Sequence, residues 1–144
     1  MTELYHAAYK PLADAGLNFT ASYQDVEYTR SHVQRGGVFV ARDRGRIVAT
    51  VSIREREATV ERPRHLYVGK LAVSPIAQRQ GIGSSLLEFA EQQARARVIE
   101  MVQLDTAKPA TQLIDWYVRR GYEAVGETHW PGKTYDSVIL AKRV

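Results

Sequence analysis

The sequence predicts a single mixed α/β domain spanning residues 1–144, with a mostly antiparallel sheet flanked by about four helices. Three observations predict this class. Short apolar runs typical of strands alternate with segments of helical periodicity along the whole chain. Tight turns join two pairs of these runs, as expected of antiparallel hairpins. The 144 residues suffice for one hydrophobic core, and no linker or internal repeat divides them.

The first half of the chain is expected to supply two helices and a hairpin. Gly36-Gly37 ends the second helix, and Asp43-Arg44-Gly45 forms the tight turn of the hairpin. In chain order, the expected elements are a helix over residues 4–16, a helix over 24–34, strands over 38–41 and 47–53, and a polar loop over 57–64.

The second half is expected to complete the sheet. Its first strand carries apolar residues on both faces, which predicts a central position in the sheet. The helix that follows has the strongest periodicity of the chain, with four apolar residues on one face. The expected elements are a strand over residues 66–73, a helix over 83–96, a strand over 100–105, a helix over 111–119, and paired strands over 122–128 and 135–141.

Composition limits the function classes that the chain can serve. It contains no cysteine, which excludes a disulfide framework, a cysteine nucleophile and a thiolate metal site. The net charge is +4, but the arginines of residues 42–64 are interleaved with acids, which favours solvated strand edges over nucleic-acid binding. No apolar run is long enough to span a bilayer and no signal-peptide pattern opens the chain, so we expect a cytoplasmic protein without a membrane partner.

The clearest motif begins where the strand 66–73 ends. Val73-Ser74-Pro75 marks a turn, a polar loop follows, and Gly81-Ile82-Gly83 opens the next helix. Such a helix start presents unpaired backbone N–H groups and the positive end of the helix dipole, so we expect a phosphate or pyrophosphate there. No Gly-Lys-Ser/Thr follows the glycines of this loop, which excludes a P-loop here, and Leu86 stands where a dinucleotide fingerprint needs a third small residue.

Two motifs together resemble a known family. Gln78-Arg79-Gln80-Gly81-Ile82-Gly83, after Val73-Ser74-Pro75, resembles the acyl-CoA loop of the GNAT acetyltransferases, whose signature is Gln/Arg-x-x-Gly-x-Gly/Ala after a strand ending in Val-x-Pro. Further along, Trp116-Tyr117-Val118-Arg119-Arg120-Gly121-Tyr122 resembles the second signature of the family, a helix with a Tyr four residues before Gly-Phe/Tyr. The order of the expected elements resembles the GNAT fold over nearly the whole chain.

The resemblance implies acetyl-CoA as the acyl donor and no metal. Backbone N–H groups of residues 79–84 would hold the pyrophosphate, and the strand before the loop would pair with the pantetheine arm and polarise the thioester carbonyl through one N–H. The Arg79 side chain is either a phosphate ligand or simply exposed to solvent. The expected CoA-binding residues are Leu71, Ala72, Val73, Gln78, Arg79, Gln80, Gly81, Ile82, Gly83, Ser84, Ser85 and Thr111.

Tyr117 is the one catalytic residue that the resemblance implies. A tyrosine of pKa about 10 is a weaker acid than a thiol of pKa about 8.5, so we expect it mainly to donate a hydrogen bond to the departing sulfur. The alternative is a core aromatic residue on an amphipathic helix. Ala110 stands where the family often has an Asn that binds pantetheine, and Thr111 is the expected substitute.

The general base is not evident, because the strand 66–73 offers no carboxylate. Candidates on neighbouring segments are Glu55, Glu57 and His65, with His129 in the last hairpin. The alternatives are that each is an ordinary surface group, and that the amine loses its proton to water.

The expected function is direct transfer of an acetyl group from acetyl-CoA to a primary amine of an unidentified small-molecule or peptide acceptor. The alternative is a non-catalytic acyl-CoA sensor of the same fold. GNAT proteins usually begin with a strand, which is here either missing or very short; its absence would expose a sheet edge that a second copy could cover. The aromatic residues expected to form walls on the acceptor side are Phe19, Tyr23, Trp130 and Tyr135.

Overall fold

Six strands form one sheet in the order β1-β2-β3-β4-β6-β5, and every neighbouring pair is antiparallel except β3 and β4. The computed structural model describes all residues from Met1 to Val144. Its strands are β1 (Val38–Asp43), β2 (Arg46–Arg56), β3 (His65–Val73), β4 (Met101–Ala107), β5 (Glu123–Thr128) and β6 (Ser137–Arg143). Its helices are α1 (Thr2–Asp14), α2 (Thr20–Tyr23), α3 (Val26–Gln34), α4 (Ile82–Ala96) and α5 (Thr111–Val118), with a 3-10 turn η1 (Pro75–Ala77).

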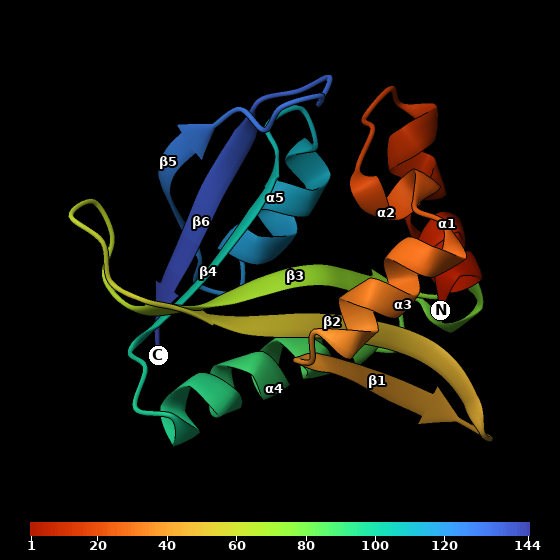
Figure 1. The fold of residues 1–144 in the computed structure, drawn as a ribbon, viewed down its shortest axis with the longest axis horizontal. Helices are drawn as coiled ribbons and strands as arrows, with labels where there is room; N and C mark the ends of the chain where they lie inside the picture. The colour runs from red at the N-terminus through yellow and green to blue at the C-terminus, as the bar shows by residue number, and fades with distance from the viewer.

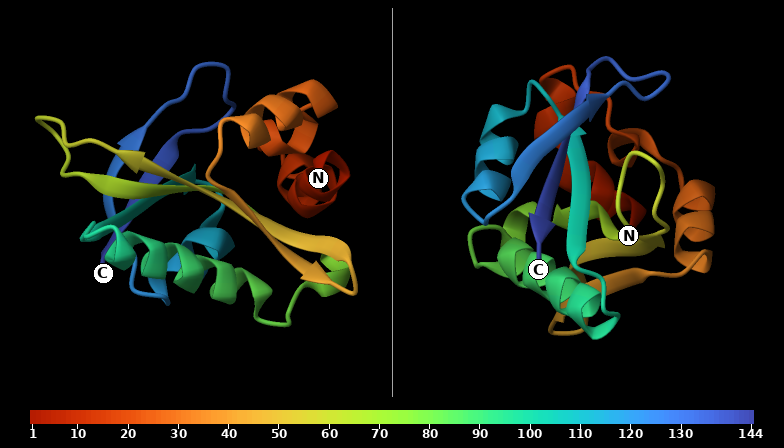
Figure 2. Two further views of the ribbon diagram at one scale, coloured as in Figure 1. Left: turned by 60° about the horizontal axis from the view of Figure 1, so that its bottom comes forward. Right: turned by 90° about the vertical axis from the view of Figure 1, so that its left-hand side faces the viewer.

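The helices cover the two faces of the sheet in separate groups (Figures 1 and 2). The helices α4 and α5 pack on one face, where their apolar residues join those of β2, β3, β4 and β6 in one large buried cluster. On the other face, α1 and α2 contribute Tyr5 and Ala21 to a smaller cluster with Ala72 of β3. The sheet therefore separates a main core from a second layer formed by the N-terminal helices.

The strands β3 and β4 are paired only at their beginnings, through Leu66 with Val102 and Tyr67 with Gln103. Beyond those residues the two strands diverge, and α5 lies beside the opening between them (Figure 1). The pairing of β3 with β2 is also interrupted, because the register shifts between Thr50 and Ser52 opposite Lys70, whose φ is +48°. The edge of β3 that faces β4 therefore has no strand partner over its second half.

Local chemistry explains the main differences from the expected elements. The helix expected to begin at residue 24 begins at Val26, because the Asp25 side chain accepts a hydrogen bond from the backbone N–H of Tyr28 and caps it. The short helix α2 was not expected, since a single turn has no readable periodicity. The first element of the structure is α1, which begins at Thr2, and β1 forms one edge of the sheet.

The remaining expected elements are present, with ends that differ by a few residues, and the prediction of a mixed, mostly antiparallel sheet is confirmed. Five α-helices form instead of about four. No helix combines the length and the apolar character needed to cross a membrane.

Candidate active site

The loop between β3 and α4 has the backbone of an anion-binding turn. Arg79 and Gly81 both have positive φ, at +64° and +77°, and Gly81 is the residue from which α4 begins. No side chain caps this helix, so its first N–H groups are left for another acceptor. A Cβ built on Gly81 would meet no atom within 4 Å, which means that the space in front of the turn is open.

Side chains around this turn are positioned by hydrogen bonds within the protein. The Gln78 amide donates to the carbonyl of Val73 at 3.2 Å, and the Ser85 hydroxyl donates to the carbonyl of Gly81 at 3.0 Å. The Ser84 hydroxyl accepts two hydrogen bonds from the Arg120 guanidinium, at 3.0 and 2.8 Å. Among the expected pyrophosphate ligands, Arg79 and Gln80 have exposed side chains.

Arg120 adds a positive charge to this helix terminus, and the sequence analysis did not single it out. Its guanidinium lies 3.8 Å from the centre of the Trp116 ring and donates to the Trp116 carbonyl at 2.8 Å. The C-terminal end of α5 is thereby fastened to the start of α4 through Ser84. The turn thus combines unpaired N–H groups, a helix dipole and a fixed arginine, which together suit a pyrophosphate.

The predicted pantetheine strand lies next to this turn. Leu71 and Val73 face the main core, whereas Ala72 packs against Tyr5 of α1. The hydroxyl of Tyr9 donates to the Leu71 carbonyl at 3.1 Å, which ties α1 to the strand where β3 has left β4. Ile82 packs at the margin of the main core, and Thr111 is an exposed residue at the start of α5.

Tyr117 is buried, with 7% of its surface exposed, on the side of α5 that faces the core. It makes edge-on contacts with Trp116 and Tyr122, at centroid distances of 5.0 and 5.8 Å. Burial, reinforced by the negative charge of Asp105, raises the pKa of the Tyr117 hydroxyl, and Arg120 offsets the rise only in part. This hydroxyl is therefore a hydrogen-bond donor across the neutral pH range.

Asp105 of β4 is the carboxylate that brings the surrounding aromatic residues together. It accepts hydrogen bonds from the Tyr67 hydroxyl and from Nε1 of Trp130, the latter at 2.9 Å. Its charge also contributes to raising the pKa of Tyr9 and of Tyr135, for both of which burial is the larger cause. We call the following residues the Asp105 cluster: Tyr9, Tyr67, Asp105, Tyr117, Trp130 and Tyr135.

The sequence analysis missed Asp105, although it placed the residue at the end of an expected strand. Its neighbours Leu104 and Thr106 are buried, so an acid sits between buried residues of a strand. That pattern is the one local signal that would have drawn attention to it.

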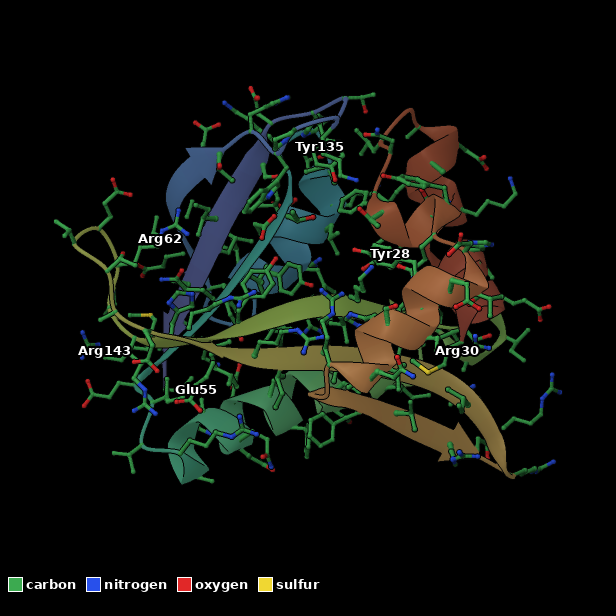
Figure 3. The ribbon with its side chains drawn as sticks, viewed as in Figure 1. Tyr28, Arg30, Glu55, Arg62, Tyr135 and Arg143 are labelled. Carbon is green, nitrogen blue, oxygen red and sulfur yellow. The ribbon has the colours of Figure 1, made fainter.

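The expected acceptor walls lie at or beside the Asp105 cluster. Trp130 and Tyr135 belong to it, and Phe19 stacks on Tyr135 at a centroid distance of 5.0 Å. Tyr23 lies farther out, where its hydroxyl accepts a hydrogen bond from Lys133 at 3.1 Å. Figure 3 shows Tyr135 and Tyr28 on the side of the sheet that carries the N-terminal helices.

The candidate bases of the sequence analysis have other environments. Glu55 forms ion pairs with Arg64 and Arg97, and it lies beside α4 rather than beside the N-terminal helices (Figure 3). Glu57 is exposed beyond the end of β2, and His129 pairs with Asp136 at 2.9 Å. His65 is buried at the start of β3, and its Nδ1 lies 2.9 Å from the carbonyl of Pro63.

Comparison with known proteins decides the family. The sequence model of the acetyltransferase (GNAT) family matches residues 2–122. The chain belongs to the GNAT acetyltransferase family. A GNAT relative, the S-(2-succino)cysteine N-acetyltransferase of Bacillus subtilis (strain 168), is 29% identical over 100% of this chain and 88% of its own length.

Solved GNAT structures have the same fold. Ribosomal-protein-alanine N-acetyltransferase from Brucella melitensis superposes with a TM-score of 0.74 at 20% identity, over 99% of this chain and 94% of that one. A GNAT acetyltransferase from Elizabethkingia anophelis, solved with acetyl-CoA bound, gives a TM-score of 0.66 at 16% identity, over 83% and 84% of the two chains. As a member of the GNAT family, this protein is an acyltransferase, and acetyl-CoA is bound in the Elizabethkingia anophelis structure. No group of three or more His, Cys, Asp or Glu side chains is arranged to hold a metal ion.

Proposed function

We propose that the protein transfers the acetyl group of acetyl-CoA directly to the primary amine of a small acceptor, within one ternary complex. The observation that carries this proposal is the position of Asp105 and Tyr117. Both lie where β3 and β4 diverge, and the charge of Asp105 reaches the Tyr117 hydroxyl. An acyl donor held along the edge of β3 would have a carboxylate and a phenol at its reactive end.

The donor side follows from the free backbone groups. N–H groups of residues 79–84 would bind the pyrophosphate, and the neighbouring Arg120 would add a charge-assisted interaction. The edge of β3 at Leu71, Ala72 and Val73 would pair with the amide groups of the pantetheine arm. One N–H of this edge would then donate a hydrogen bond to the thioester carbonyl and stabilise the oxyanion that forms there.

The acceptor side requires a neutral amine. We propose that Asp105 first attracts the ammonium form and then accepts its proton, which frees the lone pair for attack on the carbonyl carbon. A C–N bond forms and the C–S bond breaks, so that the products are an amide and CoA. Tyr117, kept protonated by burial, donates a hydrogen bond to the leaving sulfur, and the thiolate finally takes the proton that the amine has lost.

The names of the comparison proteins suggest a range of acceptors to test. The Bacillus subtilis relative is named for an amine that is a cysteine derivative, and the Brucella melitensis protein for the alanine of a ribosomal protein. The aromatic residues around Asp105 favour a small acceptor, because Tyr117 and Tyr135 are both only 7% exposed. We therefore propose that the acceptor is a small-molecule amine rather than a protein N-terminus.

The test combines calorimetry with a thiol-release assay. We expect saturable binding of acetyl-CoA, and release of CoA only when a suitable amine is present, from a panel that includes S-(2-succino)cysteine, free amino acids, putrescine and an N-terminal alanine peptide. Binding without release from any amine would support the acyl-CoA sensor instead. Absence of binding would contradict the proposal as a whole.

A further inference from the structure

The five lysines of the chain differ in their partners. Three of them form ion pairs with carboxylates: Lys10 with Asp14, Lys108 with Glu127, and Lys142 with Glu91. The other two, Lys70 and Lys133, have no carboxylate within ion-pair distance, and both donate hydrogen bonds to side chains of residues 20–24. Burial, and after it the charge of Lys133, lower the pKa of Lys70. Two unpaired ammonium groups near one another are unfavourable unless an anion joins them.

Lys70 is held in an unusual position. It occupies the interrupted register of β3 with a φ of +48°, a conformation that ordinarily favours glycine. Its ammonium lies 4.9 Å from the centre of the Tyr28 ring and 5.6 Å from that of Tyr5. Its one polar partner is the side-chain oxygen of Gln24, so two of its three N–H donors remain available.

Lys133 adds a second positive charge from the turn between β5 and β6. Its ammonium donates to the carbonyl of Asn18 at 2.9 Å, to the Thr20 hydroxyl at 2.8 Å and to the Tyr23 hydroxyl at 3.1 Å. These bonds fix its position and use all three donors. Lys133 therefore supplies positive charge to this region, whereas Lys70 is the residue able to donate directly to a ligand.

Asp105 lies on the same side of the sheet as the two lysines. Like them, it forms no ion pair. The helix α1 spans the distance between the two charges. It presents Tyr5 to Lys70 and, one turn later, Tyr9 to the region of Asp105. Tyr5 and Tyr9 are about 6 Å apart along the helix axis, so the two tyrosines lie one above the other on the same face of α1.

We infer that the acceptor is an amino acid that carries a carboxylate, with its amine at Asp105 and its carboxylate on Lys70. This inference rests on the proposed acetyl transfer and assigns the acceptor class of that same site. Asp105 supplies a negative group and Lys70 a positive group, with Tyr9 and Tyr5 of α1 beside them, which is the charge complement of such a molecule. A diamine or an amine without a carboxylate would leave Lys70 without an anionic partner.

The test compares acceptors that differ only in charge. We would measure kcat and KM for L-aspartate and L-glutamate, for their diamides, and for putrescine, with the wild type and with Lys70→Met, Lys133→Met and Lys10→Met. For the wild type we expect kcat/KM for the acids to exceed that for the diamides by about 10- to 100-fold. Lys70→Met should raise KM for the acids by a similar factor while kcat and the diamide reactions change little. Lys133→Met should have a smaller effect in the same direction, and Lys10→Met, at an exposed ion pair on α1, should have none.

The thermal stability of Lys70→Met separates a binding role from a structural one. Because this lysine is partly buried without a carboxylate partner, its removal should leave the melting temperature unchanged or raise it. Equal kcat/KM values for acids and diamides would overturn the inference, and so would an equal loss of kcat on every acceptor in Lys70→Met.

A failure of the proposed function is recognised separately. Calorimetric titration of the CoA complex with L-aspartate and L-glutamate reports on the Lys70 site without any turnover. Binding that Lys70→Met abolishes would support the carboxylate site even if no amine were acetylated. Absence of binding, together with turnover of putrescine, would overturn the inference and leave the acetyltransferase proposal intact.

Discussion

Replacement of Asp105 by asparagine tests the part of the mechanism that depends most on the structure. The Asp105→Asn substitution keeps the shape of the side chain and one oxygen acceptor, but it removes the negative charge and presents an NH2 group to one of the donors, Tyr67 or Trp130. A hydrogen bond to a charged group contributes about 1.5–3 kcal/mol, so we expect a loss of that order in unfolding free energy. A general base typically contributes a factor of about 10² to 10⁴, so kcat/KM should fall within that range.

The assay is CoA release at saturating acetyl-CoA, followed as a function of acceptor concentration and pH. Asp136→Asn is the matched control, because Asp136 is an exposed carboxylate paired with His129 and lies outside the Asp105 cluster. Tyr67→Phe removes one partner of Asp105 without removing the charge, so its effect should be smaller than about tenfold. The reasoning is refuted if Asp105→Asn, folded as judged by circular dichroism, retains activity close to that of the wild type.

Three further predictions concern the donor side and the N-terminal layer. Tyr117→Phe should lower kcat by about 10- to 100-fold with little change in the Kd of acetyl-CoA, because it removes one hydrogen bond to the leaving sulfur; an unchanged kcat would reduce Tyr117 to a core residue. Gly81→Asp should raise the Kd of acetyl-CoA at least about 100-fold in calorimetry, since it puts a carboxylate where the N–H groups face open space. The control Gly83→Ala should bind acetyl-CoA normally, because its added Cβ would meet only ordinary contacts at 3.6 Å. Equal affinities of the two variants would contradict the pyrophosphate site. Burial, together with the positive charges nearby on Lys70, Arg54 and Arg35, lowers the pKa of His32 to about 4, so the folded protein binds fewer protons than the unfolded chain between that value and about 6.5. Urea titrations should accordingly show stability falling by about 3 kcal/mol as the pH is lowered through this interval, and His32→Gln should lose that component. An identical pH dependence in the variant would rule out His32 as its source.

The loop and helices of the proposed donor side were predictable from the sequence because their geometry is local. A strand end, a proline turn and two glycines specify the loop that opens α4, and the spacing from Tyr117 to Gly121 specifies the second helix. Each of these features depends on residues close together in the chain. The same is true of the hairpin between β1 and β2, whose turn has positive φ at Arg44 and Gly45.

The acceptor side was less predictable because it depends on contacts between distant segments. Asp105 acquires its role from Tyr67, which is 38 residues earlier, and Arg120 reaches Ser84 over 36 residues. A base was expected near the strand before the loop, but the parallel pairing of β3 with β4 brings in a carboxylate from the next strand. The sequence analysis did not single out Lys70 either, because its position depends on an interruption in the pairing of β3 with β2 that no local sequence pattern predicts.

Identification of the acetylated product tests the central claim most directly. The protein would be incubated with isotopically labelled acetyl-CoA and an equimolar mixture of L-aspartate, L-glutamate, their diamides and putrescine, and the products would be analysed by mass spectrometry. We predict a labelled acetyl group on the nitrogen of a carboxylate-bearing amine, in amounts equal to the CoA released and strongly reduced in Asp105→Asn. Release of CoA without any labelled amide, or labelling that is unchanged in Asp105→Asn, would contradict this account.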